Sequence, residues 1–226
     1  MFKICVSCAP RDTSDIKLLS NCFTSYKAEL VELRLDRFRG DLQALVKALG
    51  DHAGEKPLIT TYMFDDDPSE KVLKRGFEMV SSVLEYADYI DMGNPAHSNL
   101  LKPKENGLQV IGSQHFKEPV TYEKGMSVIR SLSRHGADVV KLVFTARSFS
   151  DNLTALKICS TASGRRVVFC MGERGFLSRT LSPLYGSEWT YASFKQGYET
   201  ASGQCDLSTM YSLRAMIERP TVSEKR

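Results

Sequence analysis

The sequence predicts an α/β fold, a (β/α)8 TIM barrel that spans residues 1–226 as one domain, and three observations support this prediction. Short apolar runs rich in β-branched residues recur along the whole chain. Helix-like segments separate most of these runs, an alternation that is typical of parallel βαβ units. Eight such units suit a barrel slightly below its usual length. A doubly wound open sheet is the alternative, but no G-x-G-x-x-G motif follows any expected strand.

The expected strands are short apolar runs bounded by turn or cap residues. They cover Lys3–Cys8, Leu30–Asp36, Pro57–Tyr62, Asp88–Met92, Leu108–Ser113, Gly136–Phe144, Arg166–Met171 and a weaker run near Trp189–Phe194. The run at 136–144 reads Gly-Ala-Asp-Val-Val-Lys-Leu-Val-Phe. It is almost wholly apolar and predicts a strand that is buried on both faces.

Helical patterns occupy most of the intervals between the strands. They cover about Asp15–Tyr26, a segment that starts near Asp41, Ser69–Tyr86, Tyr122–His135, Ser150–Ala162 and Leu207–Glu218. Asp41 is a good N-cap residue. In the segment 93–107, Pro95, Pro103 and Gly107 allow only a short helix. The glycine-punctuated stretch after the seventh strand predicts a loop. Residues 219–226 predict a frayed polar tail.

Composition and charge exclude several classes of protein. The chain has 30 Lys and Arg against 27 Asp and Glu, a net charge of +3, and its basic residues are scattered. This pattern argues against nucleic acid or an anionic membrane surface as the partner. No apolar run approaches the roughly 20 residues of a membrane span, and the N-terminus enters a strand without the pattern of a signal peptide. We therefore expect a cytoplasmic protein.

The six cysteines include a C-x-x-C pair, Cys5 and Cys8. A zinc site needs a second pair of ligands at suitable spacing, and none is present. A redox pair of the thioredoxin type would begin a helix after a strand, whereas these cysteines lie within or at the end of the first strand. We therefore expect reduced thiols and no metal site.

Lys141 lies in the middle of the apolar run 136–144. Burial of an unpartnered ammonium is costly and normally lowers the pKa of the amine, and a neutral amine is a nucleophile toward ketones and aldehydes. The alternative is a lysine that points to a polar rim or is paired with a carboxylate. The polar residues at other strand ends favour the nucleophile, because they supply what a Schiff-base lysine needs.

Polar residues follow the carboxyl ends of several expected strands, where the active sites of such barrels lie. In the second strand, alternation with a period of two sends Glu32, Arg34 and Asp36 to one face. In a dry core, three charges on one face must neutralise one another or face a ligand, and an exposed edge strand is the alternative. The fifth strand leads into His115, whose side chain suits proton transfer near neutrality. A structural, hydrogen-bonded histidine is the alternative there.

Two further loops add polar groups. The stretch after the seventh strand brings Arg179, and arginine binds carboxylates or phosphates with two parallel hydrogen bonds. The short loop Ala201–Gln204 ends in an amide that both donates and accepts. Together the residues predict a Schiff-base enzyme for a small anionic ketone, with Lys141 as the nucleophile and His115 as the proton carrier. Arg34 and Arg179 would hold the anion.

At these residues the chain resembles the type I 3-dehydroquinate dehydratases of the shikimate pathway, over nearly its whole length. The matching pieces occur in the family's order: Glu32–Asp36, Ser113–His115, Gly136–Lys141, Met171–Arg179 and Ala201–Gln204. The resemblance implies a (β/α)8 barrel that needs no metal or organic cofactor. It also implies a hydro-lyase (EC 4.2.1.10) of aromatic amino acid biosynthesis that dehydrates 3-dehydroquinate to 3-dehydroshikimate.

The resemblance also implies roles for single residues. Lys141 matches the lysine that forms an iminium at the C3 ketone. His115 matches the acid/base that takes a proton from C2 and helps the C1 hydroxyl to leave. Arg179 matches the arginine that binds the substrate carboxylate, and Met171 matches an apolar residue near the imine. The remaining matches are substrate-binding positions: Glu32, Arg34, Thr200, Ala201 and Gln204.

Three positions depart from the family pattern. Met63 stands where the family has an arginine that contacts the substrate. Asp67 stands where a glutamate orients the histidine, and we expect it to serve the same role for His115, with the two preceding aspartates as alternatives. Gly93 stands where the family commonly has glutamate. These changes affect substrate affinity and rate more than reaction type, because the lysine and the histidine remain.

Two other hypotheses stay open alongside the dehydratase. One is a non-catalytic barrel that binds a metabolite, and the other is a class I Schiff-base enzyme of the aldolase type. The resemblance further suggests a homodimer and, in the native chain, a fusion to shikimate dehydrogenase. The expected ligand is the small anion 3-dehydroquinate, with neither nucleic acid nor membrane as a partner.

Overall fold

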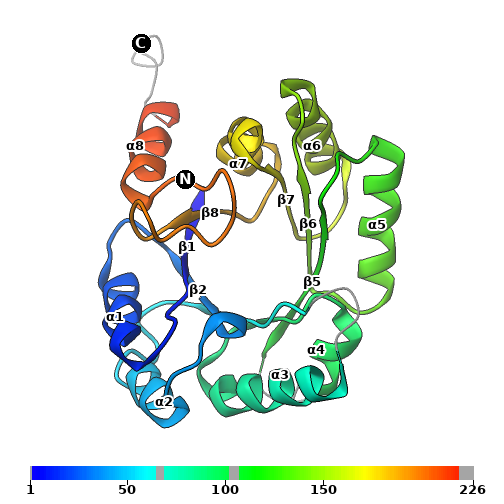
Figure 1. Ribbon diagram of the computed structural model, residues 1–226. Helices are drawn as coiled ribbons and strands as arrows, with labels where there is room; N and C mark the ends of the chain where they lie inside the picture. The colour runs from blue at the N-terminus through cyan, green and yellow to red at the C-terminus, as the bar shows by residue number, and fades with distance from the viewer. Residues whose placement is uncertain (1, 65–68, 102–106, 219–226) are drawn as a thin grey trace.

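A computed structural model of the chain describes residues 2–64, 69–101 and 107–218, without the side chains of 99–101. Eight parallel strands form a nearly closed barrel in its centre (Figure 1). The strands are β1 Lys3–Cys8, β2 Leu30–Arg34, β3 Leu58–Thr61, β4 Tyr89–Asp91, β5 Gln109–Phe116, β6 Val139–Thr145, β7 Arg166–Met171 and β8 Trp189–Ser193. The barrel predicted from the alternation of strands and helices is therefore confirmed.

Helices follow the strands in chain order and lie outside the barrel (Figure 1). They are α1 Ile16–Thr24, α2 Leu42–Gly50, α3 Glu70–Val83, α4 Pro95–Leu101, α5 Tyr122–Arg134, α6 Phe149–Thr161, α7 Phe176–Leu181 and α8 Leu207–Ile217. Within the described ranges, every helix is too short or too polar to cross a lipid bilayer. The expected tail 219–226 lies outside these ranges.

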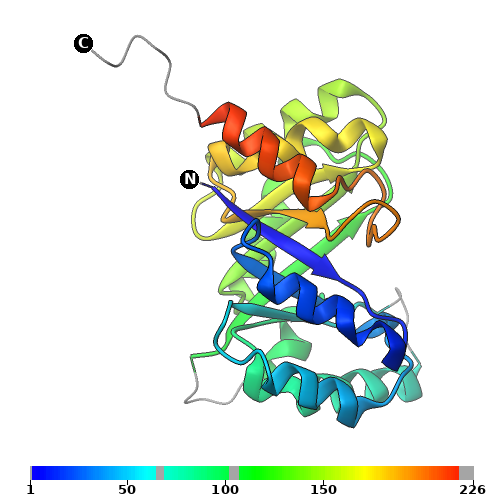
Figure 2. The same ribbon diagram turned by 90° about the vertical axis from the view of Figure 1, so that its left-hand side faces the viewer.

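Side-chain caps fix where several helices begin. Asp41 accepts a hydrogen bond from the backbone N–H of Gln43 at the start of α2, as its cap propensity predicts. Thr121 caps α5 and Asp206 caps α8 in the same way. At the far end of the chain, Phe2 N donates to Glu218 Oε1 at 2.8 Å, so the two described ends lie side by side (Figure 2).

Two strands differ from their predicted bounds. The second strand ends at Arg34 rather than Asp36, because Leu35–Arg37 turns into a 3-10 helix that buries Leu35. Asp36 therefore does not continue the face of Glu32 and Arg34, and the predicted three-charge strand face is wrong in this respect. The fifth strand is longer than predicted, because its pairing with β6 continues as far as Phe116.

The stretch after β7 was expected to be a loop but contains the helix α7. Asn152 of α6 holds its first turn in place. The Asn152 side chain donates to Arg174 O at 2.7 Å and accepts from Ser178 N at 2.9 Å. This long-range support explains why a glycine-punctuated sequence still forms a helix there.

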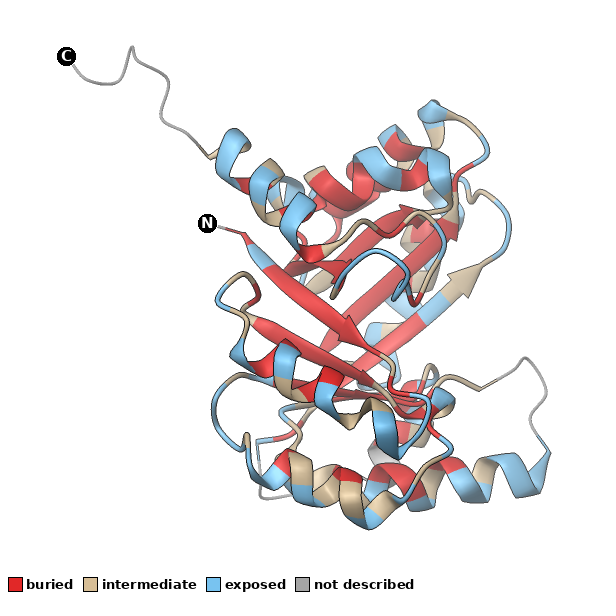
Figure 3. Ribbon diagram, turned by 60° about the vertical axis from the view of Figure 1, so that its left-hand side comes forward, coloured by how far each residue is buried: buried red, intermediate tan, exposed pale blue. Residues whose placement is uncertain are grey.

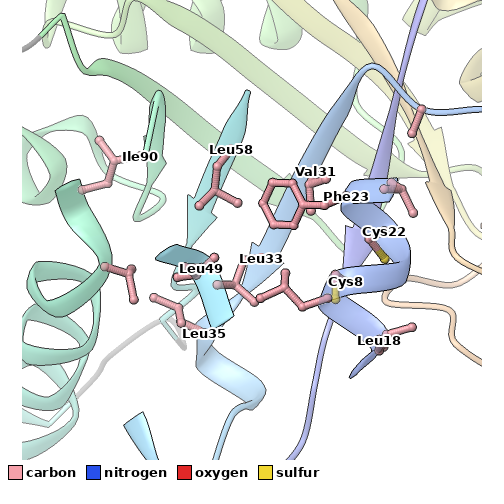
Figure 4. Packing of buried hydrophobic residues seen from close by; sticks show 14 of the residues in the cluster. Cys8, Leu18, Cys22, Phe23, Val31, Leu33, Leu35, Leu49, Leu58 and Ile90 are labelled. Carbon is pink, nitrogen blue, oxygen red and sulfur yellow. The ribbon is translucent and has the colours of Figure 1, made fainter. Parts of the chain in front are cut away.

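The outer core lies between the strands and the helices. Strand residues are mostly buried, whereas the helices expose their outer faces (Figure 3). On the side of β1 to β4, Leu33 and Val31 pack with Phe23 and Leu18 of α1 (Figure 4). The free thiols of Cys8 and Cys22 belong to the same cluster. Nonpolar burial of this kind is the main source of stability for the fold.

The barrel interior changes character along its axis. Its lower layer is apolar and contains Cys5, Leu30, Ile59, Ile111, Val139, Val167 and Trp189. Two residues further along several strands, the buried side chains become polar: Ser7, Glu32, Thr61, Asp91, Ser113 and Lys141. Because side chains two positions apart on a strand share a face, the second set forms a polar layer directly above the first.

The barrel has one seam. Strand order runs β7-β6-β5-β4-β3-β2-β1-β8, and no ladder joins β7 to β8, both of which are fully described. At the seam, Val168 N donates to Ser187 Oγ and Cys170 N donates to Ser178 Oγ, at 3.1 and 2.9 Å. Side-chain hydroxyls thus take the place of strand carbonyls. Helix α7 contacts both strands at the seam, and Thr190 Oγ1 of β8 donates to Arg179 O at 2.6 Å.

Candidate active site

A pocket opens above the polar layer, at the carboxyl ends of the strands. Its empty volume is about 430 Å³, including the mouth. The residues predicted from the sequence that line it are Glu32, Arg34, His115, Lys141, Arg179, Thr200, Ala201 and Gln204. Met171 also lines it, as the resemblance implies. Asp67 lies outside the described residues, so its role remains a prediction.

Lys141 stands in the polar layer with 6% of its surface exposed. Its Nζ donates to Glu32 Oε1 and to Asp91 Oδ2, both at 3.2 Å. The same atom lies 4.5 Å from the ring centroid of Tyr191. The three contacts come from β2, β4 and β8, and curvature of the sheet into a barrel brings these strands around one lysine.

The protonation state of Lys141 differs from the sequence-based expectation. Burial disfavours its ammonium, but the carboxylates of Glu32 and Asp91 act in the opposite direction, and the pKa of Lys141 lies well above its usual value. Burial likewise disfavours the Glu32 carboxylate, yet Lys141 and Arg34 outweigh it and lower the pKa of Glu32 to about 2. The expected neutral amine is therefore wrong for the free protein. The resting lysine is an ammonium paired with carboxylates.

Hydroxyl groups hold the Glu32 carboxylate in place. Its Oε2 accepts from Ser7 Oγ, and its Oε1 accepts from Thr61 Oγ1 at 3.1 Å as well as from Lys141. Ser7 Oγ accepts in turn from Thr200 Oγ1 at 2.8 Å. Both carboxylate oxygens are thus occupied inside the protein. Glu32 therefore acts here as a counter-ion for Lys141, in addition to its predicted contact with substrate.

Asp91 is fixed in a similar way. Its Oδ1 accepts from Ser113 Oγ at 2.7 Å and from the backbone N–H of Gly93 at 3.0 Å, which leaves Oδ2 for Lys141. Gly93 has a φ of 74°. In that left-handed region glycine is unstrained and glutamate is not, which gives a structural reason for glycine at this position.

His115 lies inside β5, where its side chain lines the pocket. Burial and the nearby Lys141 ammonium lower the pKa of His115 to about 4. Within the described part of the chain, no group hydrogen-bonds to its imidazole. The ring is therefore neutral at pH 7 and able to accept a proton.

Arg34 is only partly available to a ligand. Its Nε and Nη2 donate to the two carboxylate oxygens of Asp36, both at 2.9 Å. Burial disfavours the guanidinium, but the hydrogen bonds and charge of Asp36 raise the pKa of Arg34. The Nη1 group makes no hydrogen bond within the described residues. Nη1 is thus the part of this side chain that a ligand could reach.

Arg179 is a buried cation without a carboxylate partner among the described residues. It is 1% exposed and lies over the Phe169 ring at 4.5 Å. Its Nη2 makes a long hydrogen bond of 3.5 Å to Ser202 O, and its Nε has no partner. Burial lowers the pKa of Arg179 to about 10, which still leaves it charged at neutral pH. An anionic ligand would supply the missing partner.

The loop after β8 closes one side of the pocket. Gln204 Oε1 accepts from Thr200 N at 2.8 Å, which folds the loop back on itself and leaves the amide N–H groups of Gln204 for a ligand. Ser202 O accepts from Gly172 N at 3.0 Å, across the seam between β7 and β8. The predicted residues Thr200, Ala201 and Gln204 are therefore presented as one unit.

Sequence reasoning left several residues in the pocket, or in the polar layer beneath it, without a role. Asp91 ends an apolar run, and a carboxylate at a strand end was a usable signal for it. Ser7 and Tyr191 carry no such signal, because each resembles any other residue of a buried strand. Met63 lines the pocket with an apolar side chain. Among the described residues, no group of three or more His, Cys, Asp or Glu side chains is arranged to hold a metal ion.

Comparison with known proteins agrees with the resemblance seen in the sequence. Residues 4–220 match the family model of type I 3-dehydroquinase. A 3-dehydroquinate dehydratase of Dehalococcoides mccartyi is 35% identical over 114 residues, which cover 50% of this chain and 50% of that protein. A bifunctional chloroplastic 3-dehydroquinate dehydratase/shikimate dehydrogenase of Arabidopsis thaliana is 28% identical over 209 residues, 83% of this chain and 33% of that protein.

A solved structure shows the likeness over nearly the whole chain. The 3-dehydroquinate dehydratase of Aquifex aeolicus is 26% identical, with a TM-score of 0.75, and the match covers 97% of this chain and 100% of that one. The matched segment spans about half the length of the Dehalococcoides relative. The family model nonetheless covers the described barrel almost from end to end. The chain belongs to the type I 3-dehydroquinase family.

Proposed function

We propose that the chain dehydrates 3-dehydroquinate to 3-dehydroshikimate through a Schiff base on Lys141. The arrangement of the pocket is the observation that carries this proposal. It combines an ammonium held by two carboxylates, a neutral imidazole at His115 and the buried guanidinium of Arg179, which has no carboxylate partner among the described residues. A substrate with a ketone, an acidic C–H bond and a carboxylate has one group for each of them.

Imine formation balances without an external acid. The ammonium of Lys141 passes one proton to a neighbouring base, and the neutral amine attacks the C3 ketone. Glu32 and Asp91, each 3.2 Å from Nζ, are bases within reach. The ketone oxygen then leaves as water with two of the three ammonium hydrogens. The iminium keeps one hydrogen and the positive charge.

His115 performs the proton transfers of the elimination. Its neutral ring takes a proton from C2, and the electron pair moves into the iminium to give an enamine. The enamine electrons then expel the C1 hydroxyl, which leaves as water with the proton carried by His115. Water adds to the resulting iminium, and product release restores the Lys141 ammonium. We assign the orientation of the His115 ring to Asp67, as the sequence predicts.

Two arginines and an amide bind the anion. Arg179 holds the substrate carboxylate, because its guanidinium is buried and lacks a carboxylate partner among the described residues. The Nη1 group of Arg34 and the amide N–H groups of Gln204 contact the substrate hydroxyls. Glu32, Thr200 and Ala201 complete the substrate-binding set. Met63 supplies no charge, so we expect binding to depend more heavily on Arg179.

The cellular context is also part of the proposal. A cytoplasmic location agrees with the six cysteines, all of which are free thiols. A fusion to shikimate dehydrogenase in the native chain is supported by the bifunctional Arabidopsis relative. A homodimer stays a prediction that sedimentation of the purified chain tests.

The test is reductive trapping of the purified protein with 3-dehydroquinate and borohydride, followed by peptide mass mapping. We expect one adduct on Lys141 and, without borohydride, a rise in ultraviolet absorbance as the conjugated enone forms. Lys141→Ala should lose both signals. His115→Ala should still give the trapped adduct but not the enone, because only the proton transfers are lost.

The other hypotheses correspond to distinct outcomes. Stabilisation by 3-dehydroquinate without adduct or enone would contradict the enzyme and favour the metabolite-binding barrel. An adduct on Lys141 with other small ketones, and none with 3-dehydroquinate, would favour an aldolase-type enzyme. A His115→Ala protein with near-normal turnover would contradict the acid/base role.

A further inference from the structure

The two cations of the pocket lie on two aromatic rings that contact each other. Lys141 Nζ is 4.5 Å from the centroid of the Tyr191 ring, and Arg179 Cζ is 4.5 Å from the centroid of the Phe169 ring. The two ring centroids are 6.0 Å apart, and each residue is 3% exposed. We call Phe169 and Tyr191 the aromatic floor of the pocket.

The floor crosses the seam of the barrel. Phe169 belongs to β7 and Tyr191 to β8, the two strands that no ladder joins. Each ring follows an apolar residue of the lower layer by two positions, Val167 and Trp189 respectively. At the corresponding position, two residues beyond the lower layer, the other strands carry polar side chains, whereas β7 and β8 carry these two aromatic rings. Each cation therefore lies against one of these rings at the level where the other strands carry polar side chains.

The charged and titratable groups around Lys141 come from several strands. They are Glu32 and Arg34 on β2, Asp91 on β4, His115 on β5, Cys5 on β1 and Tyr191 on β8. Burial raises the pKa of Tyr191 well above its usual value, so its phenol stays neutral. Its hydroxyl makes no hydrogen bond within the described residues. The ring face is therefore what Tyr191 offers to the lysine.

Imine formation changes what the nitrogen can donate. An ammonium has three hydrogens, whereas an iminium has one, so at most one of the hydrogen bonds to Glu32 and Asp91 survives. The positive charge remains. A ring face attracts a cation through its quadrupole and needs no hydrogen from it. Of the three contacts to Lys141, the one with Tyr191 is thus the least affected by covalent attachment.

We propose that Tyr191 is a positioning residue whose ring face keeps the nitrogen of Lys141 cationic, both as the free ammonium and as the iminium. The second half of this statement rests on the proposed function, and the first half does not. Removal of the ring should make the ammonium easier to deprotonate. Removal of the hydroxyl alone should not.

The test uses formaldehyde and cyanoborohydride, which together methylate neutral amines. Peptide mass mapping measures the methylation rate of Lys141 at a series of pH values from 6 to 11. The rate rises with the neutral fraction of the amine. Tyr191→Leu should move this rise to lower pH by about one unit, the size expected for a buried cation–π contact. Tyr191→Phe keeps the ring and should leave the rise in place. Phe169→Leu, which removes the ring under Arg179, should also leave it in place.

The outcomes separate the claims. A rise that does not move in a folded Tyr191→Leu protein would overturn the proposal, because a purely structural role changes the amount of modification but not its pH dependence. Should that variant fail to fold, 3,4,5-trifluorophenylalanine at position 191 keeps the ring and weakens its negative face. The rise should then move relative to Tyr191→Phe, and no movement would overturn the proposal. Absence of a 3-dehydroquinate adduct in the unmodified protein would contradict the proposed function and leave these formaldehyde results intact.

Discussion

Lys141 and His115 share one pocket but hold their protons in opposite ways. The lysine is an ammonium paired with two carboxylates, whereas the imidazole is neutral although the unperturbed pKa of histidine lies close to neutrality. Burial disfavours the charged imidazolium of His115, and the positive charge on the lysine disfavours it further. The site is therefore set for a base at His115 before any substrate arrives.

The first prediction concerns the titration of His115. Burial and the Lys141 ammonium lower its pKa to about 4, so the ring should remain a base from pH 7 down to about pH 4. The folded pKa is below the unfolded value of about 6.5. The contribution of this group to stability is therefore complete above pH 6.5 and is lost as the pH falls through 4. NMR titration of the ring, assigned with a His115→Gln variant, should give a midpoint near 4, and a midpoint near 6.5 would contradict it.

A second prediction concerns the buried charge of Arg179. Arg179→Met should raise the free energy of unfolding by about 1–3 kcal/mol, because a buried guanidinium with no carboxylate partner in the described part of the chain is replaced by a side chain that suits the core. It should also raise KM for 3-dehydroquinate by about 10- to 100-fold, the value of a charge-assisted hydrogen-bonded pair. Chemical denaturation and steady-state kinetics measure the two effects.

The matched control for Arg179 is another buried arginine. Arg214 is 4% exposed, but it donates to Glu29 Oε1 at 2.7 Å and to Phe2 O at 3.1 Å. Arg214→Met should therefore destabilise the protein and leave KM unchanged. If both substitutions destabilise to the same extent, Arg179 has a partner that the described residues do not include.

At the scale of single residues, the sequence predicted which residues form the site better than it predicted their protonation states. Lys141 stands out as a charge inside an apolar run, and His115 and Arg179 stand out because each follows such a run. The protonation of Lys141 was wrong because it depends on Glu32 and Asp91, which are 109 and 50 residues away. No local pattern encodes those distances. Tyr191 was overlooked for the same reason, since only the closed barrel places its ring beside the lysine.

At the scale of elements, the loop after β8 depends on close packing against the end of β7. Gly203 has a φ of 72°, and a Cβ there would lie 2.0 Å from the carbonyl oxygen of Gly172. The backbones of the two loops thus touch where Ser202 O accepts from Gly172 N. The position of Gln204 over the pocket follows from this contact.

A third prediction follows for Gly203→Ala. The added methyl should displace the loop that carries Thr200 and Gln204 and lower kcat/KM at least 10-fold, with about 1 kcal/mol lost from left-handed strain. Gly197→Ala is the control, because it has a φ of 86° but no atom within 4 Å of the added Cβ. It should lose similar stability and keep kcat/KM. Equal kinetic effects in the two variants would show that strain, rather than the clash, is responsible.

Element boundaries were predicted well where local signals decide them. Strand β1 and strand β7 have their predicted bounds, and α2 begins after its aspartate cap. The errors occurred where distant groups decide. Asn152 of α6 supports α7, and pairing with β6 extends β5. Such contacts become visible only once the chain has closed on itself.

At the scale of the whole molecule, the barrel is continuous except at the seam between β7 and β8. Amides of β7 that face the seam are held by serine hydroxyls, as Val168 N is by Ser187 Oγ. Amides of β6 are held by strand carbonyls from the neighbouring strand β5 or β7. The seam should therefore be the weakest line of the barrel.

A fourth prediction tests this with hydrogen exchange. Ser187→Ala removes the acceptor of Val168 N, so peptides from β7 should exchange about 5- to 10-fold faster, equivalent to one lost hydrogen bond of about 1 kcal/mol. Peptides from β6 should be unaffected. Mass spectrometry of exchange in both variants gives the comparison, and equal acceleration in β6 and β7 would mean that the whole barrel opens as one unit.

The seam also gives the ligand a mechanical part to play. Arg179 follows β7 on one side of the gap, and Gln204 follows β8 on the other. Serine and threonine hydroxyls, backbone hydrogen bonds such as Glu188 N to Arg166 O, and two neighbouring rings connect the sides. If Arg179 binds the carboxylate of the substrate and Gln204 binds one of its hydroxyls, the substrate connects the two edges of the seam. A force that pulls β7 from β8 would then act on the bound molecule first. The bound substrate would thus bridge the gap between β7 and β8 in the barrel that binds it.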